Sequence, residues 1–189
     1  LARALVAQPE MLLLDEPLSA LDPVTRGETE RELKKLHLTL GLTTLMVTHN
    51  FEEVFALADR VAVILEGALA QVGTPQEVFR SPKSREVARF VGIENFLPVR
   101  RAADGSCILP GGHPFHLKGK SLPSSPLFYL GLRPEDLIVD TAPVQADYCL
   151  PARVTEASCS GATATVTVAV GEGILAHAHL SLHRFVEAG

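Results

Sequence analysis

The sequence predicts an α/β domain, in which helices accompany a parallel sheet, followed by a small all-β domain of barrel or sandwich type. Within residues 1–92, short apolar runs alternate with longer amphipathic patterns, as in strand–helix–strand units. Within residues 93–189, short alternating strands are separated by turns rich in Gly and Pro. We therefore expect a domain boundary near residues 92–95. Both ends fall in helical patterns, so we expect a piece of a longer protein whose second domain is truncated at the C-terminus.

The composition describes a globular chain without a membrane segment. It has 189 residues, 47% of them hydrophobic, and a formal net charge of −5. No apolar run approaches the roughly 20 residues that a membrane-spanning helix needs. The thinly spread negative charge argues against a nucleic-acid partner, for which a basic stripe is expected. The three cysteines form no CxxC pair, which fits a reducing cytosol better than a disulfide framework.

The first predicted strand ends in two carboxylates. The apolar run Met11–Leu14 is too short for a helix and predicts a strand buried on both faces. Asp15 and Glu16 follow it, and Pro17 ends the strand. Ligands of open α/β sheets bind at this end of the strands, so the two acids predict a cation site, a water-activating site or both. The alternative is a cap for the following turn.

A helix and a second strand come next. Asp22 is a good N-cap, Pro23 suits the first helical position, and Gly41 suits the residue just past the helix end. The β-branched, apolar run 43–48 predicts a strand that leads directly to His49. Two strand–helix units in sequence predict parallel pairing, which places His49 on the same sheet edge as the two acids. The alternative is an ordinary surface or core histidine.

Further capping and turn signals complete the predicted elements. Asn50 should cap a helix, with Glu53 completing a capping box, and Thr74 with Glu77 predicts a second such box. Another helix should open at Ser81. The predicted hairpins pair residues 61–65 with 68–72 and residues 162–170 with 174–182.

Taken together, these residues resemble a known family. Leu12–Pro17 resembles a Walker B strand with its following glutamate, and Ser19–Asp22 resembles a D-loop. Thr48–Asn50 resembles the switch histidine of ATP-binding cassette (ABC) ATPases. Leu1–Ala7 resembles the tail of the helix that follows the LSGGQ motif in this family. Ala58–Val61 is also similar to the corresponding segment of these subunits. The resemblance runs through residue 92 and implies part of a P-loop NTPase fold.

The resemblance implies roles for five residues in a site for ATP and Mg²⁺. Asp15 would hold the Mg²⁺ ion through a water, and Glu16 would polarise the attacking water or accept its proton. His49 would contact the γ-phosphate. Ser19 and Asp22 would complete the nucleotide site at the contact with a second copy of the subunit, because these ATPases trap ATP between two head-to-tail copies.

Three motifs of the family are missing from this sequence. It has no GxxxxGK[ST] phosphate loop, no glutamine loop and no LSGGQ. Without the phosphate loop, the chain lacks the backbone cradle and the lysine that hold the β- and γ-phosphates. We therefore expect this polypeptide alone neither to bind nor to hydrolyse ATP appreciably.

The second half resembles the regulatory domain of bacterial ABC importers. Gly131–Asp136 carries the sharpest likeness, and Ala152–Val154 with its hairpin resembles the OB-like TOBE domain, whose relatives bind molybdate or tungstate. A candidate oxyanion site comprises Arg153, Ser158, Ser160, Gly161 and Thr163. The alternative is a plain Ser/Gly loop between strands. His177 and His179 share a strand face, which suits zinc or simply an alternating wet strand.

The resemblance implies the ATPase subunit of an importer at the cytoplasmic face of a bacterial inner membrane. Its partners would be a second ATPase copy, transmembrane permease subunits and, indirectly, a periplasmic or lipoprotein substrate-binding protein. Val87–Phe96 resembles molybdate or tungstate subunits, while sulfate, iron, polyamine and sugar remain open. The alternatives are an oxyanion-sensing binding module and a soluble ABC protein without a membrane partner.

Overall fold

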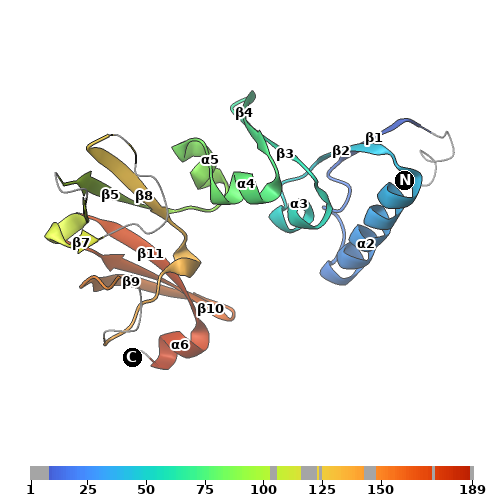
Figure 1. Ribbon diagram of the computed structural model, residues 1–189. Helices are drawn as coiled ribbons and strands as arrows, with labels where there is room; N and C mark the ends of the chain where they lie inside the picture. The colour runs from blue at the N-terminus through green and yellow to red at the C-terminus, as the bar shows by residue number, and fades with distance from the viewer. Residues whose placement is uncertain are drawn as a thin grey trace. The chain divides into compact units, whose positions relative to one another are not determined.

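The computed structural model describes residues 9–102, 106–115, 123, 125–142, 148–171 and 173–187 (Figure 1). The chain divides into two compact units, Leu1–Lys83 and Ser84–Gly189. The helical pattern at the N-terminal end predicts a helix over residues 2–8, which lies outside the described residues. None of the described helices has the length and apolar character needed to cross a membrane.

The first unit combines a two-stranded parallel sheet with a β-hairpin. Its elements are β1 (Met11–Asp15), α2 (Pro23–Leu40), β2 (Thr43–Val47), α3 (Phe51–Leu57), β3 (Val61–Leu65), β4 (Ala68–Gly73) and α4 (Pro75–Arg80). β1 and β2 are parallel, with Asp15 opposite Val47, and α2 connects them. β3 and β4 are antiparallel neighbours. The predicted parallel pair and the predicted hairpin are both confirmed.

Local capping sets the bounds of α2. The Asp22 carboxylate accepts hydrogen bonds from the backbone N–H groups of Val24 and Thr25, each at 3.1 Å. The helix ends at Gly41, whose φ of 62° is left-handed, a conformation that glycine adopts without steric cost. The Thr74 and Glu77 capping box of α4 also forms. These predictions are confirmed because each depends on contacts within one helical turn.

The parallel sheet is not buried on both faces as predicted. Leu12 is 9% exposed, whereas Met11 is 53% and Leu13 is 68% exposed. On β2, Leu45 and Val47 are also mostly exposed. An apolar run shows that both faces of a strand can be buried, but it does not show which segments pack on them. The sheet has two strands, and within the described residues one of its faces stays open.

The second unit contains two antiparallel sheets, ordered β7-β6-β5-β8 and β11-β10-β9 (Figure 1). Its elements are α5 (Arg85–Phe90), β5 (Asn95–Arg101), β6 (Cys107–Ile108), η1 (Pro110–Gly112), β7 (Pro114–Phe115), β8 (Leu127–Leu132), η2 (Pro134–Asp136), β9 (Arg153–Ser160), β10 (Thr163–Ala169), β11 (Leu175–Ser181) and α6 (Leu182–Glu187). The hairpin predicted from the alternating pattern is β10–β11. The helix expected to open at Ser81 is α5, which begins later because the Ser84 hydroxyl accepts the Val87 N–H.

Within the described residues, the two sheets do not close into the barrel that we expected. Each has its own apolar cluster, one around Val99 and Cys107 and the other around Val166 and Leu180. β9 is exposed along its whole length and pairs only with β10 among the described strands. Closure would require another strand along that edge. Strand alternation predicts sheets, but the long-range pairing that closes a barrel leaves no local signal.

Candidate functional site

Glu16 stands at the carboxyl end of β1 in an unusual backbone conformation. Its N–H continues the parallel ladder by donating to the Val47 carbonyl at 2.9 Å. Its φ is then 42°, a left-handed value that non-glycine residues seldom adopt. Ser19 braces this turn, because both its hydroxyl (2.9 Å) and its N–H (3.3 Å) donate to the Glu16 carbonyl. Such outliers persist where the surroundings impose them, and they are concentrated at functional sites.

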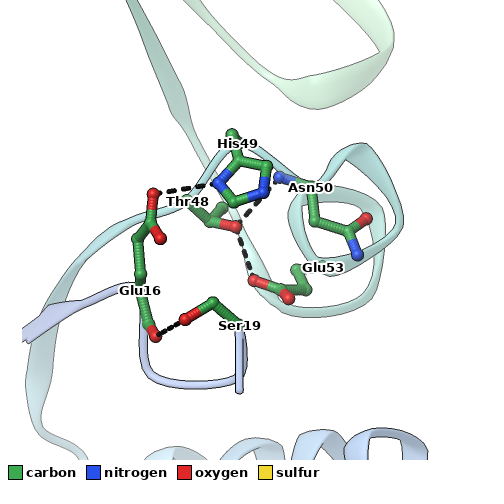
Figure 2. Close-up of polar contacts among 6 residues, drawn as sticks. All are labelled: Glu16, Ser19, Thr48, His49, Asn50 and Glu53. Carbon is green, nitrogen blue, oxygen red and sulfur yellow. Dashed lines mark hydrogen bonds and ion pairs between the residues drawn. The ribbon is translucent and has the colours of Figure 1, made fainter. Parts of the chain in front are cut away.

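The side chains of Glu16 and His49 meet across the ends of the two parallel strands. Figure 2 shows His49 Nδ1 facing Glu16 Oε1, and the distance is 2.9 Å. Because a carboxylate only accepts, Nδ1 carries the shared proton. The side chains are 74% (His49) and 46% (Glu16) exposed, and exposed pairs of this kind add little stability. The contact therefore calls for an explanation other than folding.

These two residues open onto a pocket of about 460 Å³. Its lining residues are Glu16, Ser19, Arg26, Thr48, His49, Asn50, Phe51, Glu52 and Glu53. Arg26 donates from Nη2 to the Leu21 carbonyl at 3.1 Å, while its buried Nε has no hydrogen-bond partner among the residues that the structure describes. Sequence reasoning missed Arg26 as a site residue. A basic side chain one turn into the helix that follows the D-loop was the available signal.

The capping box predicted for α3 does not form. Asn50 caps the helix as expected, since its side-chain oxygen accepts the Glu52 N–H at 2.8 Å. The Glu53 carboxylate, however, accepts from the Thr48 hydroxyl at 2.5 Å instead of reaching the Asn50 backbone. Thr48 lies outside the four residues of the capping-box motif, and its hydroxyl competes with the Asn50 N–H as the donor to Glu53. A buried acid next to the site was therefore mistaken for a helix-capping residue.

Asp15 and Asp22 lie outside that pocket lining. Asp15 is exposed, and its carboxylate makes no hydrogen bond or ion pair with the described residues. A hard oxygen ligand with no competing partner suits Mg²⁺, which retains several waters. Hydrogen bonds from Thr25, first from its hydroxyl and then from its N–H, hold the pKa of Asp22 below its ordinary value. No cluster of three or more metal-ligating side chains occurs in the described part of the chain.

The five candidate oxyanion residues do not gather at one point. Arg153 lies opposite Ala169 and Ser158 lies opposite Thr165, which separates them by roughly 15 Å at the usual rise of a strand. Ser160, Gly161 and Thr163 lie together at the β9–β10 turn, where the Thr163 hydroxyl donates to the Ser160 carbonyl. The oxyanion site stays a prediction, and the plain Ser/Gly loop stays its alternative.

Two histidines of the second unit have local partners. His177 Nδ1 lies 3.1 Å from the Thr167 hydroxyl, and His183 Nδ1 lies 3.5 Å from the Glu187 carboxylate. Neither contact involves a set of metal ligands.

Comparison with known proteins finds homologues of the chain. It is 47% identical, over 86% of its length, to the sulfate/thiosulfate import ATP-binding protein CysA 2 of Chromobacterium violaceum, and covers 44% of that protein. It is 37% identical over its full length to the molybdate/tungstate import ATP-binding protein WtpC of Pyrococcus horikoshii, covering 54% of it. The chain is a homologue of the ATP-binding proteins of ABC importers. The resemblance inferred from the motifs is thus confirmed.

This homologue matches the C-terminal part of its relatives and spans about half of their length. Models of known protein families give no match to it. The relatives are named for the import of different substances. A Rhizobium meliloti relative, 44% identical over 73% of this chain and 35% of its own length, is named for import of Fe(3+) ions. A Borreliella afzelii relative, 42% identical over 72% of this chain and 39% of its own length, is named for spermidine and putrescine.

Proposed function

We propose that this chain is the C-terminal part of the ATP-hydrolysing subunit of an ABC importer, with Glu16 and His49 at the catalytic centre. The observation that carries the proposal is their 2.9 Å contact across the ends of β1 and β2. It joins the residue after the Walker B-like strand to the histidine after the next strand, and it opens onto a pocket. Homology to ABC importer ATPases supports the same role.

In this proposal Glu16 positions and deprotonates the attacking water. Its Oε1 accepts the His49 Nδ1 proton, so Oε2 is the oxygen that accepts from water. A positioned carboxylate base contributes about 10²–10⁴-fold to such a reaction. The braced left-handed backbone of Glu16 holds that carboxylate at the strand end. For His49 to donate to an anionic oxygen of the substrate through Nε2 as well, its ring would carry a proton on both nitrogens.

ATP and Mg²⁺ would supply the electrophilic γ-phosphate and the charge that neutralises it. The free carboxylate of Asp15 is the group that would hold the metal, through a water. Ser19, beside Glu16, and Asp22, at the start of α2, would face a second copy of the subunit. The described residues would contribute acidic side chains and His49 to the nucleotide site. They contain no phosphate loop.

We further propose an oxyanion as the cargo, with molybdate or tungstate favoured by the resemblance of Val87–Phe96. Both the sulfate/thiosulfate and the molybdate/tungstate relatives are named for oxyanions. The partners would then be permease subunits and an external binding protein, with the chain at the cytoplasmic face of the membrane. Calorimetric titration with molybdate, tungstate and sulfate tests whether the second unit also senses the anion. Absence of heat with all three would exclude that sensing role.

A hybrid subunit tests the catalytic proposal. This chain would replace the matching segment of the Chromobacterium violaceum relative, so that the relative supplies the preceding half. We expect Mg²⁺-dependent ATP hydrolysis, which Glu16→Gln and His49→Ala each reduce by about 10²–10³-fold. Glu94→Ala, an exposed change in the second unit, should leave it unchanged. A Glu16→Gln hybrid with undiminished turnover would refute the assignment.

The chain alone gives a complementary prediction. Because it lacks a phosphate loop, it should release no phosphate from ATP in a malachite-green assay and should not bind ATP at ordinary micromolar concentrations. Turnover that survives purification and is lost on Glu16→Gln would show that the described residues form a complete site, contrary to this expectation.

A further inference from the structure

The most deeply buried acid at the site is one to which neither the motifs nor the proposed mechanism gives a role. Glu53, on the first turn of α3, is 2% exposed. A carboxylate removed from water in this way must be compensated by a strong partner. That partner is the Thr48 hydroxyl, whose oxygen lies 2.5 Å from Glu53 Oε2. The bond is short for an O–H···O contact.

This bond fixes the orientation of the Thr48 hydroxyl. The hydroxyl has a single proton, and it goes to Glu53. The oxygen therefore presents a lone pair to the Asn50 N–H, which donates to it at 3.0 Å. Figure 2 shows the resulting chain of contacts from Glu53 through Thr48 to Asn50. The residues on both sides of His49 are thus tied to one buried carboxylate.

The His49 ring itself is held lightly. It is 74% exposed, and its one hydrogen bond within the described residues is the 2.9 Å contact with Glu16. Since an exposed pair is worth little, the ring faces Glu16 chiefly because its backbone is held in place. Removing the Thr48–Glu53 bond should release that backbone and let the imidazole turn into solvent.

We propose that Glu53 is a positioning residue that, through Thr48, holds His49 against Glu16. The inference rests on the proposed function, because that function gives the Glu16–His49 contact its catalytic role; the geometry of the contact does not depend on it. A purely helical role for Glu53, as an acid near the N-terminus of α3, is the competing explanation. Glu52 provides a matched control, because it is an exposed acid in the same turn with no side-chain bond to Thr48.

The test is the ring signature of His49 in ¹⁵N NMR of the whole 189-residue chain at about pH 8. The chain has seven histidines, so the His49→Gln spectrum identifies the signal. A neutral ring bonded to a carboxylate through Nδ1 is an Nδ1–H tautomer. We expect that signature in the parent chain, and its loss in favour of the solvent-type Nε2–H tautomer in both Glu53→Leu and Thr48→Val.

Three variants should keep the parental signature. Glu53→Gln and Thr48→Ser retain an acceptor and a donor for the bond, and Glu52→Leu removes an equal charge without touching it. A folded Glu53→Leu chain with an unchanged signature would overturn the proposal, as would a Glu52→Leu chain that loses it equally. If Glu53→Leu does not fold, Thr48→Val decides by the same criterion. This readout is independent of ATP turnover, so an inactive hybrid subunit would count against the proposed function alone.

Discussion

Asn95 connects the two sheets of the second unit, and replacing it with alanine should weaken that unit measurably. Its side chain is 1% exposed; it donates to the His177 carbonyl at 2.8 Å and accepts the His177 N–H at 2.6 Å. Each bond contributes about 1 kcal/mol net. His177 is half-buried, so water can partly replace the lost partner. We therefore expect Asn95→Ala to lower the free energy of unfolding by about 2 kcal/mol.

Cys107 offers a reporter within the same unit. It is fully buried beside Val99, whereas Cys149 and Cys159 are exposed. In a chain that carries serine in place of the two exposed cysteines, thiol labelling after urea equilibration reads unfolding around Cys107 alone. With a urea dependence of about 1–2 kcal/mol per molar, a loss of about 2 kcal/mol moves the midpoint down by about 1–2 M.

Glu94→Ala is the control for Asn95→Ala. Glu94 is the preceding residue and is exposed, so its removal should leave the midpoint within about 0.3 M of the parent, corresponding to a surface change. An Asn95→Ala midpoint equal to that of the control would refute the reasoning, because it would mean that the amide bonds between β5 and β11 contribute nothing to stability.

Two further predictions concern α2. At both Gly27 and Gly41 an added Cβ meets no atom within 4 Å. Gly27→Ala, inside the helix, should raise the free energy of unfolding by about 1 kcal/mol, whereas Gly41→Ala, at a left-handed residue, should lower it by about 1 kcal/mol. Urea denaturation in which both variants change stability in the same direction would contradict this. Hydrogen bonds from Thr25 lower the pKa of Asp22 in the folded chain. The ionised Asp22 carboxylate therefore stabilises the folded chain fully at pH values above its unfolded pKa of about 3.9, and this stabilisation is lost as the pH falls through the lower folded pKa. Circular dichroism between about pH 5 and about pH 2 should show this helix loss in the parent but less of it in Asp22→Asn, and an identical loss in both would be contrary evidence.

Sequence reasoning succeeded where the deciding interactions are local or follow from strand direction. The bounds of α2 depend on Asp22 and Gly41, whose contacts lie within one turn. The meeting of Glu16 and His49 follows from the parallel pairing of their strands, since both stand at carboxyl ends. Neither prediction needed knowledge of what packs on the sheet.

It failed where two partners compete or where distant segments decide. Glu53 could satisfy either the Asn50 N–H or the Thr48 hydroxyl, and spacing favoured the wrong one. Exposure of Leu13 depends on what covers the sheet. The Asn95 amide forms hydrogen bonds between the two sheets of the second unit in place of a continuous ladder. No periodicity in the sequence predicts such a contact.

The geometry of the site is imposed by the backbone rather than by the side chains that would perform the chemistry. Glu16 is held by the β1–β2 ladder and by Ser19, despite a left-handed φ of 42°. His49 is held by the Thr48–Glu53 bond on one side and by the Asn50 cap on the other. The Glu16–His49 contact is consequently cheap to break, because neither backbone needs to move for the side chains to separate. Two firmly placed residues suit the proposed role, in which Oε1 of Glu16 accepts from His49 and Oε2 accepts from water.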